Sequence, residues 1–237
     1  MPAARLPAPR KDLLAGHYEA TGGPSTPRMG RDGFMMTPTP AGRYRVAGCA
    51  RHSSTGRYKA WSMFRWGSPM KDEGGKVFVM HDGKWTDVAV VGITRAEILD
   101  SCWKLYRLRT VTPTWVFNDF GHITCYLYRD TNNNARQDAN ERTLSEMLHP
   151  DPVNEARAFW EMPAKLDVSH GCVHLKPADI DDMINRKYMR KNNLVVVHPY
   201  SEMRISYGKD SSNHQPPYEL HFYPGLQLMI VLGTEKL

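Results

Sequence analysis

The most informative stretch of this chain is Ser169-His170-Gly171-Cys172-Val173-His174-Leu175. A glycine directly before a cysteine lets the backbone turn tightly, so that the thiol can stand exposed beside backbone N–H groups. Histidines lie on both sides of this cysteine. The pattern therefore marks Cys172 as a candidate nucleophile with polar neighbours. The alternative is a small buried apolar cysteine, which is the commoner role of this residue.

The residues around this stretch extend the pattern to Leu-Asp-Val-Ser-His-Gly-Cys-Val-His-Leu-Lys-Pro-Ala-Asp-Ile, residues 166–180. This string resembles the signature of the L,D-transpeptidase catalytic domain family (the YkuD type). In that family Ser or Thr, His, Gly and Cys are followed by an apolar residue and then by Arg or Asn. His174 stands at the Arg or Asn position, where this chain departs from the family.

The resemblance implies a cysteine acyltransferase acting on peptidoglycan stem tetrapeptides through a thioester. Cross-linking, exchange of D-amino acids and L,D-carboxypeptidase cleavage share that intermediate. Cys172 would attack, and backbone N–H groups at Gly171 and Cys172 would hold the oxyanion. His170 would orient the site, Ser169 would belong to its hydrogen-bond frame, and His174 would contact substrate. This mechanism requires no metal and no organic cofactor.

The family's general base is a histidine on a strand upstream of the motif, and two histidines compete for this role. His149 lies 20 positions before Ser169 (169 − 149) and follows Met-Leu, with a proline after it. This apolar-apolar-His-turn character favours His149. His122 begins the alternating segment His122–Tyr128, and it is the alternative base, a residue facing the cleft or a surface strand residue.

Two further segments predict substrate contacts. Thr37-Pro-Thr-Pro-Ala-Gly-Arg-Tyr-Arg-Val46 reads as a turn into a half-buried strand, and it resembles a family segment near the cleft. Residues 58–70 are rich in aromatic residues and Met. These residues either pack in the core or form an apolar wall of the cleft, as in the family. Tyr44 and Trp61 are the candidate contacts.

The fold class predicted is mainly β with peripheral helices, as a β-sandwich or mixed sheets of the L,D-transpeptidase type. Hydrophobic periodicity predicts strands and helices along the chain. Strands are expected at 77–80, 87–91, 122–128 and 194–198, and helices at 95–107, 153–161 and 177–185. Thr94 and Glu97 form a capping-box pattern at the start of the first helix.

The domain organisation predicted is a loosely ordered arm over residues 1–30 followed by a single catalytic domain over 31–237. The region 120–168 carries a polar loop and a short helix. Residues 218–232 read as a hairpin around Pro224-Gly225 that completes the sheet. The family places such a strand pair before the Thr-Pro segment, so the chain is interpreted as circularly permuted, with this hairpin next to the strand of Tyr44.

A polar loop follows the expected strand that ends at Tyr128. Counted from Asp130, oxygen-bearing side chains fall at the positions of an EF-hand calcium loop. They are Asp130, Asn132, Asn134, Asp138 and Glu141. Ala135 replaces the usual glycine, and only three ligands are anionic, so Ca²⁺ would bind weakly. The alternative is a polar loop held by Asp and Asn turns.

Composition limits the remaining possibilities. Apolar residues make up 41% and charged residues 24% of the 237 residues, as in ordinary globular proteins, and the net charge of +6 suits an anionic polymer. No dense basic tract indicates nucleic acid, and no run approaches the ~20 apolar residues of a membrane span. The four cysteines form no CxxC pair, and one disulfide among Cys49, Cys102 and Cys125 is compatible with the sequence.

The expected place of action is the periplasm or cell envelope. No secretory signal is visible, so either a leader has been trimmed or export needs none. An alternative is therefore a secreted antibacterial effector that uses the same chemistry on a rival's wall and has an immunity protein as partner. A non-catalytic wall-binding module is a further alternative. Metal binding by Cys172, His170 and His174 is disfavoured because one short loop gives an awkward four-ligand geometry.

Overall fold

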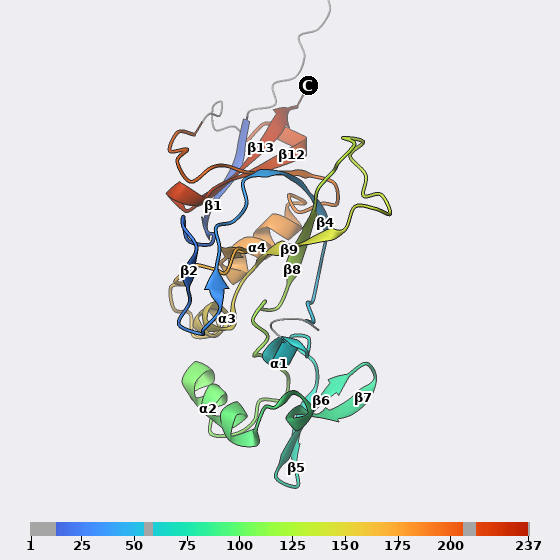
Figure 1. Ribbon diagram of the computed structural model, residues 1–237, viewed down its shortest axis with the longest axis vertical. Coiled ribbons are helices and arrows are strands. Elements are labelled where there is room, and N and C mark those ends of the chain that lie inside the picture. Colours follow the sequence, from blue (N-terminus) through green and yellow to red (C-terminus); the bar gives the residue numbers. More distant parts are fainter. Residues whose placement is uncertain (1–12, 55–58, 206–211, 237) are drawn as a thin grey trace, which may run out of the picture.

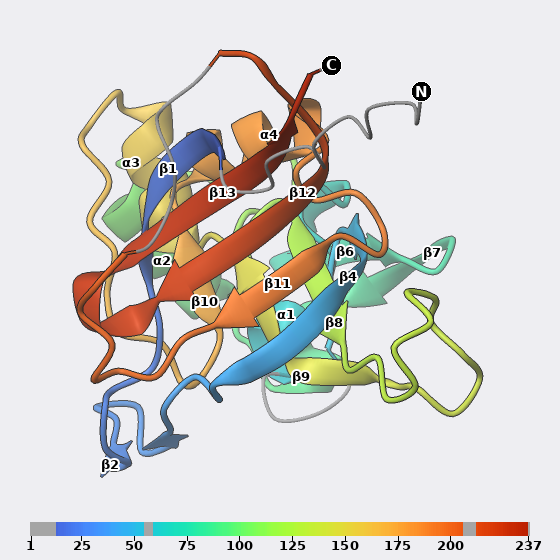
Figure 2. The ribbon, with the colours of Figure 1, turned by 90° about the horizontal axis from the view of Figure 1, so that it is seen from above.

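The structure is a computed structural model, and it describes residues 13–54, 59–205 and 212–236. Within these residues, eight strands close into a barrel (Figures 1 and 2). In order around the barrel they are β1 (Leu13–Thr21), β10 (Val173–Leu175), β9 (Thr143–His149), β8 (Thr124–Tyr128), β4 (Gly42–Ala50), β11 (Leu194–Val197), β12 (His214–Tyr223) and β13 (Leu228–Glu235). Closure leaves no unpaired sheet edge. The predicted mainly β fold is confirmed.

The barrel core follows from the alternation of side chains along its strands. In β4, Tyr44 and Val46 are buried while Arg43 faces solvent, as the sequence predicts. The helix α4 (Pro177–Asn185), predicted over the same residues, adds Ile180 and Met183 to this core. The helix α3 (Pro152–Phe159) lies beside the barrel and confirms the helix expected near 153–161. No helix among the described residues is both long and apolar enough to cross a membrane.

A second lobe is inserted between the neighbouring antiparallel strands β4 and β8 (Figure 1). Its buried cluster includes Phe64, Ile98 and Trp115, separately from the barrel core. The sequence did not predict this division into two cores. The lobe contains α1 (Lys59–Ser62), β5 (Met70–Glu73), β6 (Lys76–His81), β7 (Lys84–Asp87), the 3-10 helix η1 (Val88–Val91) and α2 (Arg95–Tyr106).

The local signals within this lobe are mostly confirmed. Thr94 caps α2, its side chain accepting from the Glu97 N–H while the Glu97 carboxylate accepts from the Thr94 N–H. The strand β6 covers the predicted residues 77–80. The strand expected at 87–91 is wrong: Asp87 caps η1 by accepting from the Ala89 N–H, so the apolar run forms one helical turn.

Cys49 and Cys125 lie opposite each other on β4 and β8 and form a disulfide. Their strands leave and re-enter the barrel on either side of the inserted lobe. The disulfide therefore closes the base of that lobe. Cys102 is a buried free thiol on α2, in the core where the helical spacing placed it.

Two expectations about the ends of the chain need correction. Residues 1–12 of the predicted arm lie outside the described residues, but 13–21 form β1, which pairs with β10 and β13. Short strands β2 (Arg28–Met29) and β3 (Met35–Met36) follow. The Pro and Gly content marked turns rather than disorder. A strand thus does precede Thr37, which removes the reason for inferring a permutation.

The C-terminal hairpin does join the sheet, with the 3-10 turn η2 (Pro224–Leu226) between β12 and β13. Its position differs from the prediction. β12 pairs in parallel with β11, and β11 separates it from β4 and Tyr44. β13 pairs with β1 and closes the barrel.

Candidate active site

The Cys172 motif leads directly into β10, which runs parallel to β9. In this register Val173 is opposite Leu148 and His174 is opposite His149. Side chains two residues apart share a face of a strand, so Cys172 and His174 point to the same side. The in-register His149 joins them there. Strand pairing thus brings the proposed nucleophile and the favoured histidine together across a gap of 23 residues (172 − 149).

The turn before Cys172 is held by Ser169, which is buried. Its hydroxyl donates to the Cys172 carbonyl (2.5 Å) and accepts from the Gly171 N–H (3.0 Å). Gly171 has φ of +132°, a region that favours glycine. A Cβ there would also lie 3.1 Å from the Thr37 hydroxyl oxygen.

These contacts place Ser169 in the hydrogen-bond frame of the turn, while the oxyanion hole predicted at Gly171 and Cys172 stays a prediction. The Gly171 N–H is already bonded to Ser169. The Cys172 N–H, in contrast, has no acceptor among the described residues. An oxyanion beside the sulfur would therefore meet the Cys172 N–H rather than the Gly171 N–H.

The segment after β1 supports the motif from the other side. The Thr37 hydroxyl donates to the His170 carbonyl (3.0 Å), and the Thr39 hydroxyl donates to the Cys172 carbonyl (3.4 Å). The Ser169 N–H donates to the Gly22 carbonyl. Sequence analysis singled out the Thr-Pro-Thr-Pro segment as lying near the cleft but did not assign these roles to its threonines.

His170 lies beside an acidic residue that no pattern in the sequence predicts. Its Nε2 lies 2.9 Å from a carboxylate oxygen of Asp32, in the β2–β3 turn. Asp32 falls 138 residues before His170 (170 − 32), and no local spacing signals this pair. The predicted role of His170, to orient the site, stays a prediction.

The Cys172 thiol is partly buried, and its sulfur lies 3.8 Å from the Ser145 carbonyl oxygen. Burial raises the pKa of this thiol to about 11, and the nearby Glu146 carboxylate adds to the increase. A backbone hydrogen bond from Met147 acts in the opposite direction, because it stabilises the thiolate. The resting group is thus a protonated thiol that needs a base before it can attack.

His149 is the best-prepared base. It is buried at the end of β9, and its Nδ1 lies 2.7 Å from the Pro150 carbonyl. A carbonyl only accepts, so Nδ1 carries the proton and Nε2 keeps its lone pair. Burial holds the pKa of His149 well below its usual value. The ring packs between Phe120 and His174, with centroids 4.7 and 4.9 Å away.

His174 is a second neutral imidazole at the same place. Its Nδ1 lies 3.0 Å from the Asp167 carbonyl, which again leaves Nε2 without a proton. Burial lowers its pKa as well. The position at which the family has Arg or Asn therefore carries an uncharged side chain beside the candidate base.

Two cavities meet at the sulfur. Phe120, His170 and Cys172 line both of them. One, of about 220 Å³, is completed by His149, His174, Pro152, Val153 and three carboxylates, Asp32, Asp119 and Asp151. The other, of about 330 Å³, is completed by Thr37, His52, Ser54, Ser145, Glu146, Met147 and Gly171. The nucleophile is therefore approached from two sides.

The inserted lobe supplies part of these walls, which sequence analysis did not foresee. The Asp119 carboxylate accepts from the Ser62 hydroxyl (2.7 Å), and burial raises the pKa of Asp119. The ring of Phe120 also packs against His52, whose Nδ1 lies 2.9 Å from the Tyr126 hydroxyl. The sequence showed no pattern that links these residues to the motif.

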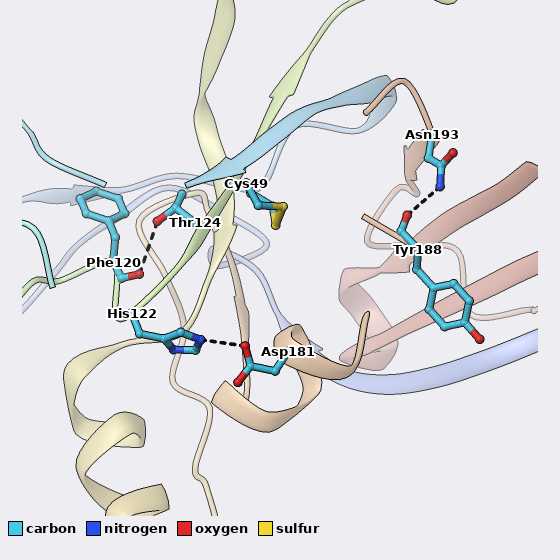
Figure 3. Close-up of a disulfide and its surroundings, with 8 residues drawn as sticks. Cys49, Phe120, His122, Thr124, Asp181, Tyr188 and Asn193 are labelled. Carbon is cyan, nitrogen blue, oxygen red and sulfur yellow. Dashed lines mark hydrogen bonds and ion pairs between the residues drawn. A yellow bond between two sulfur atoms is a disulfide. The ribbon is translucent and has the colours of Figure 1, made fainter. Parts of the chain in front are cut away.

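His122 is not in this site. Its Nδ1 lies 2.5 Å from Glu155 on α3, and its Nε2 lies 3.0 Å from Asp181 on α4 (Figure 3). Burial alone would lower its pKa, but these two carboxylates raise it to about 9. His122 is therefore a charged link between helices, and it lines neither cavity beside Cys172. Its predicted roles as base or substrate contact are wrong.

Tyr44 and Trp61 are also displaced from the cleft. Tyr44 is buried in the barrel core, with its hydroxyl donating to the Pro40 carbonyl. Trp61 packs on Trp115 and Phe117 in the lobe. Both side chains pack in a core instead of lining the cleft. Burying an aromatic ring between elements removes more apolar surface from water than placing it in a cleft wall.

The predicted calcium loop lies between β8 and β9. Asp130 accepts from Arg45 and the Ala135 N–H, and Glu141 accepts from the Thr131 and Asp138 N–H groups. The Asn132 and Asn134 amides donate to Asp138. The loop closes on itself as an Asp and Asn turn network, and no group of three His, Cys, Asp or Glu poised for a metal occurs in the described part of the chain. Calcium binding stays a prediction.

A family model described as the L,D-transpeptidase catalytic domain matches residues 5–197. The matched segment contains the Cys172 motif, His149 and the inserted lobe. No curated protein and no solved structure matches the chain.

Proposed function

The chain belongs to the L,D-transpeptidase catalytic domain family, and we propose that it uses Cys172 as the nucleophile of a peptidoglycan acyltransferase. The family acts on peptidoglycan, and its members are typically proteins of the cell envelope. The observation that carries the proposal is that Cys172, directly before β10, and the neutral His149, at the end of the parallel strand β9, line the same cavity.

The first half-reaction acylates the enzyme. His149 Nε2 takes the thiol proton as the Cys172 sulfur bonds to the carbonyl carbon of the L-centre in the donor stem. The Cys172 N–H and the polar cavity wall stabilise the oxyanion. When the carbonyl reforms, the C–N bond to the terminal D-amino acid breaks. The leaving amine takes the proton from His149, and a thioester remains.

The second half-reaction regenerates the thiol. An amine of a second stem, a free D-amino acid or water attacks the thioester carbonyl and gives its proton to His149. The C–S bond breaks, and the sulfur recovers the proton. Two cavities meeting at Cys172 suit this sequence, because donor and acceptor must reach one sulfur from different directions.

The disulfide supports the proposed place of action. Cys49–Cys125 links two strands of the folded barrel, and structural disulfides are characteristic of oxidising compartments. This observation agrees with a periplasmic or cell-envelope enzyme.

The test is incubation with soluble disaccharide-tetrapeptide, followed by intact-mass analysis of the protein and its products. The wild type should carry a thioester adduct on Cys172 and release the terminal D-amino acid, whereas Cys172→Ala should do neither. Cys102→Ala is the matched control and should keep the adduct, because Cys102 is buried in the lobe. Stem processing that survives in Cys172→Ala would refute the proposal.

A further inference from the structure

A basic and aromatic groove of about 470 Å³ lies between α2 of the lobe and α3 of the barrel. Its walls carry three cations, Lys104, Arg107 and Arg157, beside the exposed side chains of Trp160 and Met162. The two helices are tied together here, since the Trp160 indole N–H donates to the Leu105 carbonyl (3.1 Å). The groove is thus built from both lobes.

The charge of this groove is largely uncompensated. Lys104 is paired with Asp100, and Arg157 Nε donates to the Pro163 carbonyl (2.6 Å). Among the described residues, neither Arg107 nor Arg157 has a carboxylate partner. Trp160 as a whole residue is 45% exposed, although its indole N–H is satisfied and its ring packs edge-to-face with Phe159. Cations beside an open aromatic face suit a ligand that carries both carboxylates and flat apolar faces, as sugar rings do.

The groove and the candidate active site share one lining residue. Val153 lines both the groove and the 220 Å³ cavity that contains Cys172. The helix α3 leads from one to the other, with Pro152 at the Cys172 end and Trp160 just past its C-terminus. Eight helical residues span roughly 12 Å. The Trp160 end of the groove is therefore roughly one helix length from Pro152, which lines the Cys172 cavity.

Resting on the function proposed above, we infer that this groove binds the uncut remainder of the polymeric substrate. The occupant is an anionic glycopeptide strand, whose stem carboxylates meet Arg107 and Arg157 and whose sugars stack on Trp160. A polymer held there presents a neighbouring stem to Cys172. Binding in the groove then makes intact peptidoglycan a better substrate than small soluble fragments.

The main variant is Arg107→Asn with Arg157→Gln. Arg107 has φ of +56°, which Asn tolerates well, so the helix end is preserved. The matched control is Lys71→Gln with Trp85→Ala, another exposed cation and indole pair, on β5 and β7 at a distance from the groove. A second pair, Trp160→Ala and Trp160→Phe, separates the aromatic ring from the indole N–H.

Two readouts test the inference. In the first, purified insoluble peptidoglycan is sedimented with each protein in a Cys172→Ala background at increasing NaCl. The double Arg variant and Trp160→Ala should bind about tenfold more weakly than the parent, and the Arg variant should also lose most of the salt dependence. Trp160→Phe and the control should bind like the parent.

In the second readout, the ratio of turnover on insoluble peptidoglycan to turnover on disaccharide-tetrapeptide is measured with Cys172 present. This ratio should fall about tenfold in the double Arg variant and remain constant in the control. If the double Arg variant lost equal turnover on both substrates, or sedimented with peptidoglycan like the parent, the groove would not be the binding site for the polymer. Absence of turnover by the wild type on either substrate would instead count against the proposed chemistry, while sedimentation still reports on the groove.

Discussion

The thiol of Cys172 and the imidazole of His149 are both uncharged at neutral pH. Burial raises the pKa of the first to about 11 and depresses the pKa of the second. A free thiolate is therefore scarce, and attack depends on transfer of the thiol proton to His149 during the reaction. This differs from cysteine enzymes in which a neighbouring cation creates a standing thiolate.

The rate of Cys172 alkylation should report this raised pKa. With iodoacetamide in excess, the second-order rate constant should keep rising above pH 9, because the thiolate fraction grows until pH exceeds the pKa of about 11. Peptide mass mapping at each pH gives the rate. A profile that levels off at the ~8.5 of an ordinary cysteine would contradict the buried neutral thiol.

Substitutions of the three histidines should differ sharply in their effects on kcat/KM. His149→Ala should lower kcat/KM on disaccharide-tetrapeptide by roughly 10²–10⁴-fold, the usual contribution of a general base. His174→Ala should cost less, because His174 supports the His149 ring by an edge contact. His122→Ala, outside the site, is the control and should stay near wild type after correction for folded protein. A larger loss in His174→Ala than in His149→Ala would reassign the base.

At the level of elements, the β8–β9 loop combines a calcium-loop spacing with an internal network of hydrogen bonds. Asp130 is already neutralised by Arg45, and Ala135 adopts φ of +58° where a glycine would be less strained. Both features reduce the affinity expected for Ca²⁺. They also show how the loop keeps its shape through side-chain to backbone contacts.

Calcium should therefore stabilise the protein only slightly. At a free concentration about tenfold above a millimolar Kd, the unfolding free energy should rise by about 1.4 kcal/mol relative to EGTA. Urea unfolding, repeated at CaCl₂ concentrations that rise about tenfold from one sample to the next, measures this change in the unfolding free energy. Glu141→Gln should abolish the increase, with Glu161→Gln on the surface as control. An equal increase in both variants would mean general ionic stabilisation.

At the level of the whole molecule, the active site is assembled where the barrel meets the inserted lobe. The barrel supplies Cys172, His149 and His174, while the lobe's return segment supplies Asp119 and Phe120. The Cys49–Cys125 disulfide lies at the base of that lobe. The disulfide therefore helps to fix the position of the cavity wall that Asp119 and Phe120 form.

Loss of this disulfide should reduce both stability and substrate binding. Cys49→Ala with Cys125→Ala should lower the unfolding free energy by roughly 2–4 kcal/mol, because the bond closes a loop of 76 residues. The KM for disaccharide-tetrapeptide should rise as Phe120 loses its fixed position. Urea unfolding and steady-state kinetics measure the two effects. Dithiothreitol should reproduce them in the wild type and change nothing further in the variant.

Much of the local structure was readable from the sequence, since its causes lie within a few residues. The capping box of α2, the extent of α4 and the alternation of Tyr44 and Val46 depend on periods of 3.6 and 2. The Ser-His-Gly-Cys motif is equally local: its resemblance to the family signature is carried by four consecutive residues, and its turn is held by Ser169 and Gly171, two positions apart.

The sequence by itself determined the mainly β fold, and it predicted Cys172 as the nucleophile and His149 as its base. Only the tertiary structure decided that His122 bridges two helices, that Asp32 holds His170 and that Cys49 pairs with Cys125. It also decided that a lobe walls the cleft and that a groove leads away from it. The physical reason is that these contacts join residues tens of positions apart, and their pairing is fixed by barrel closure and packing rather than by any local period.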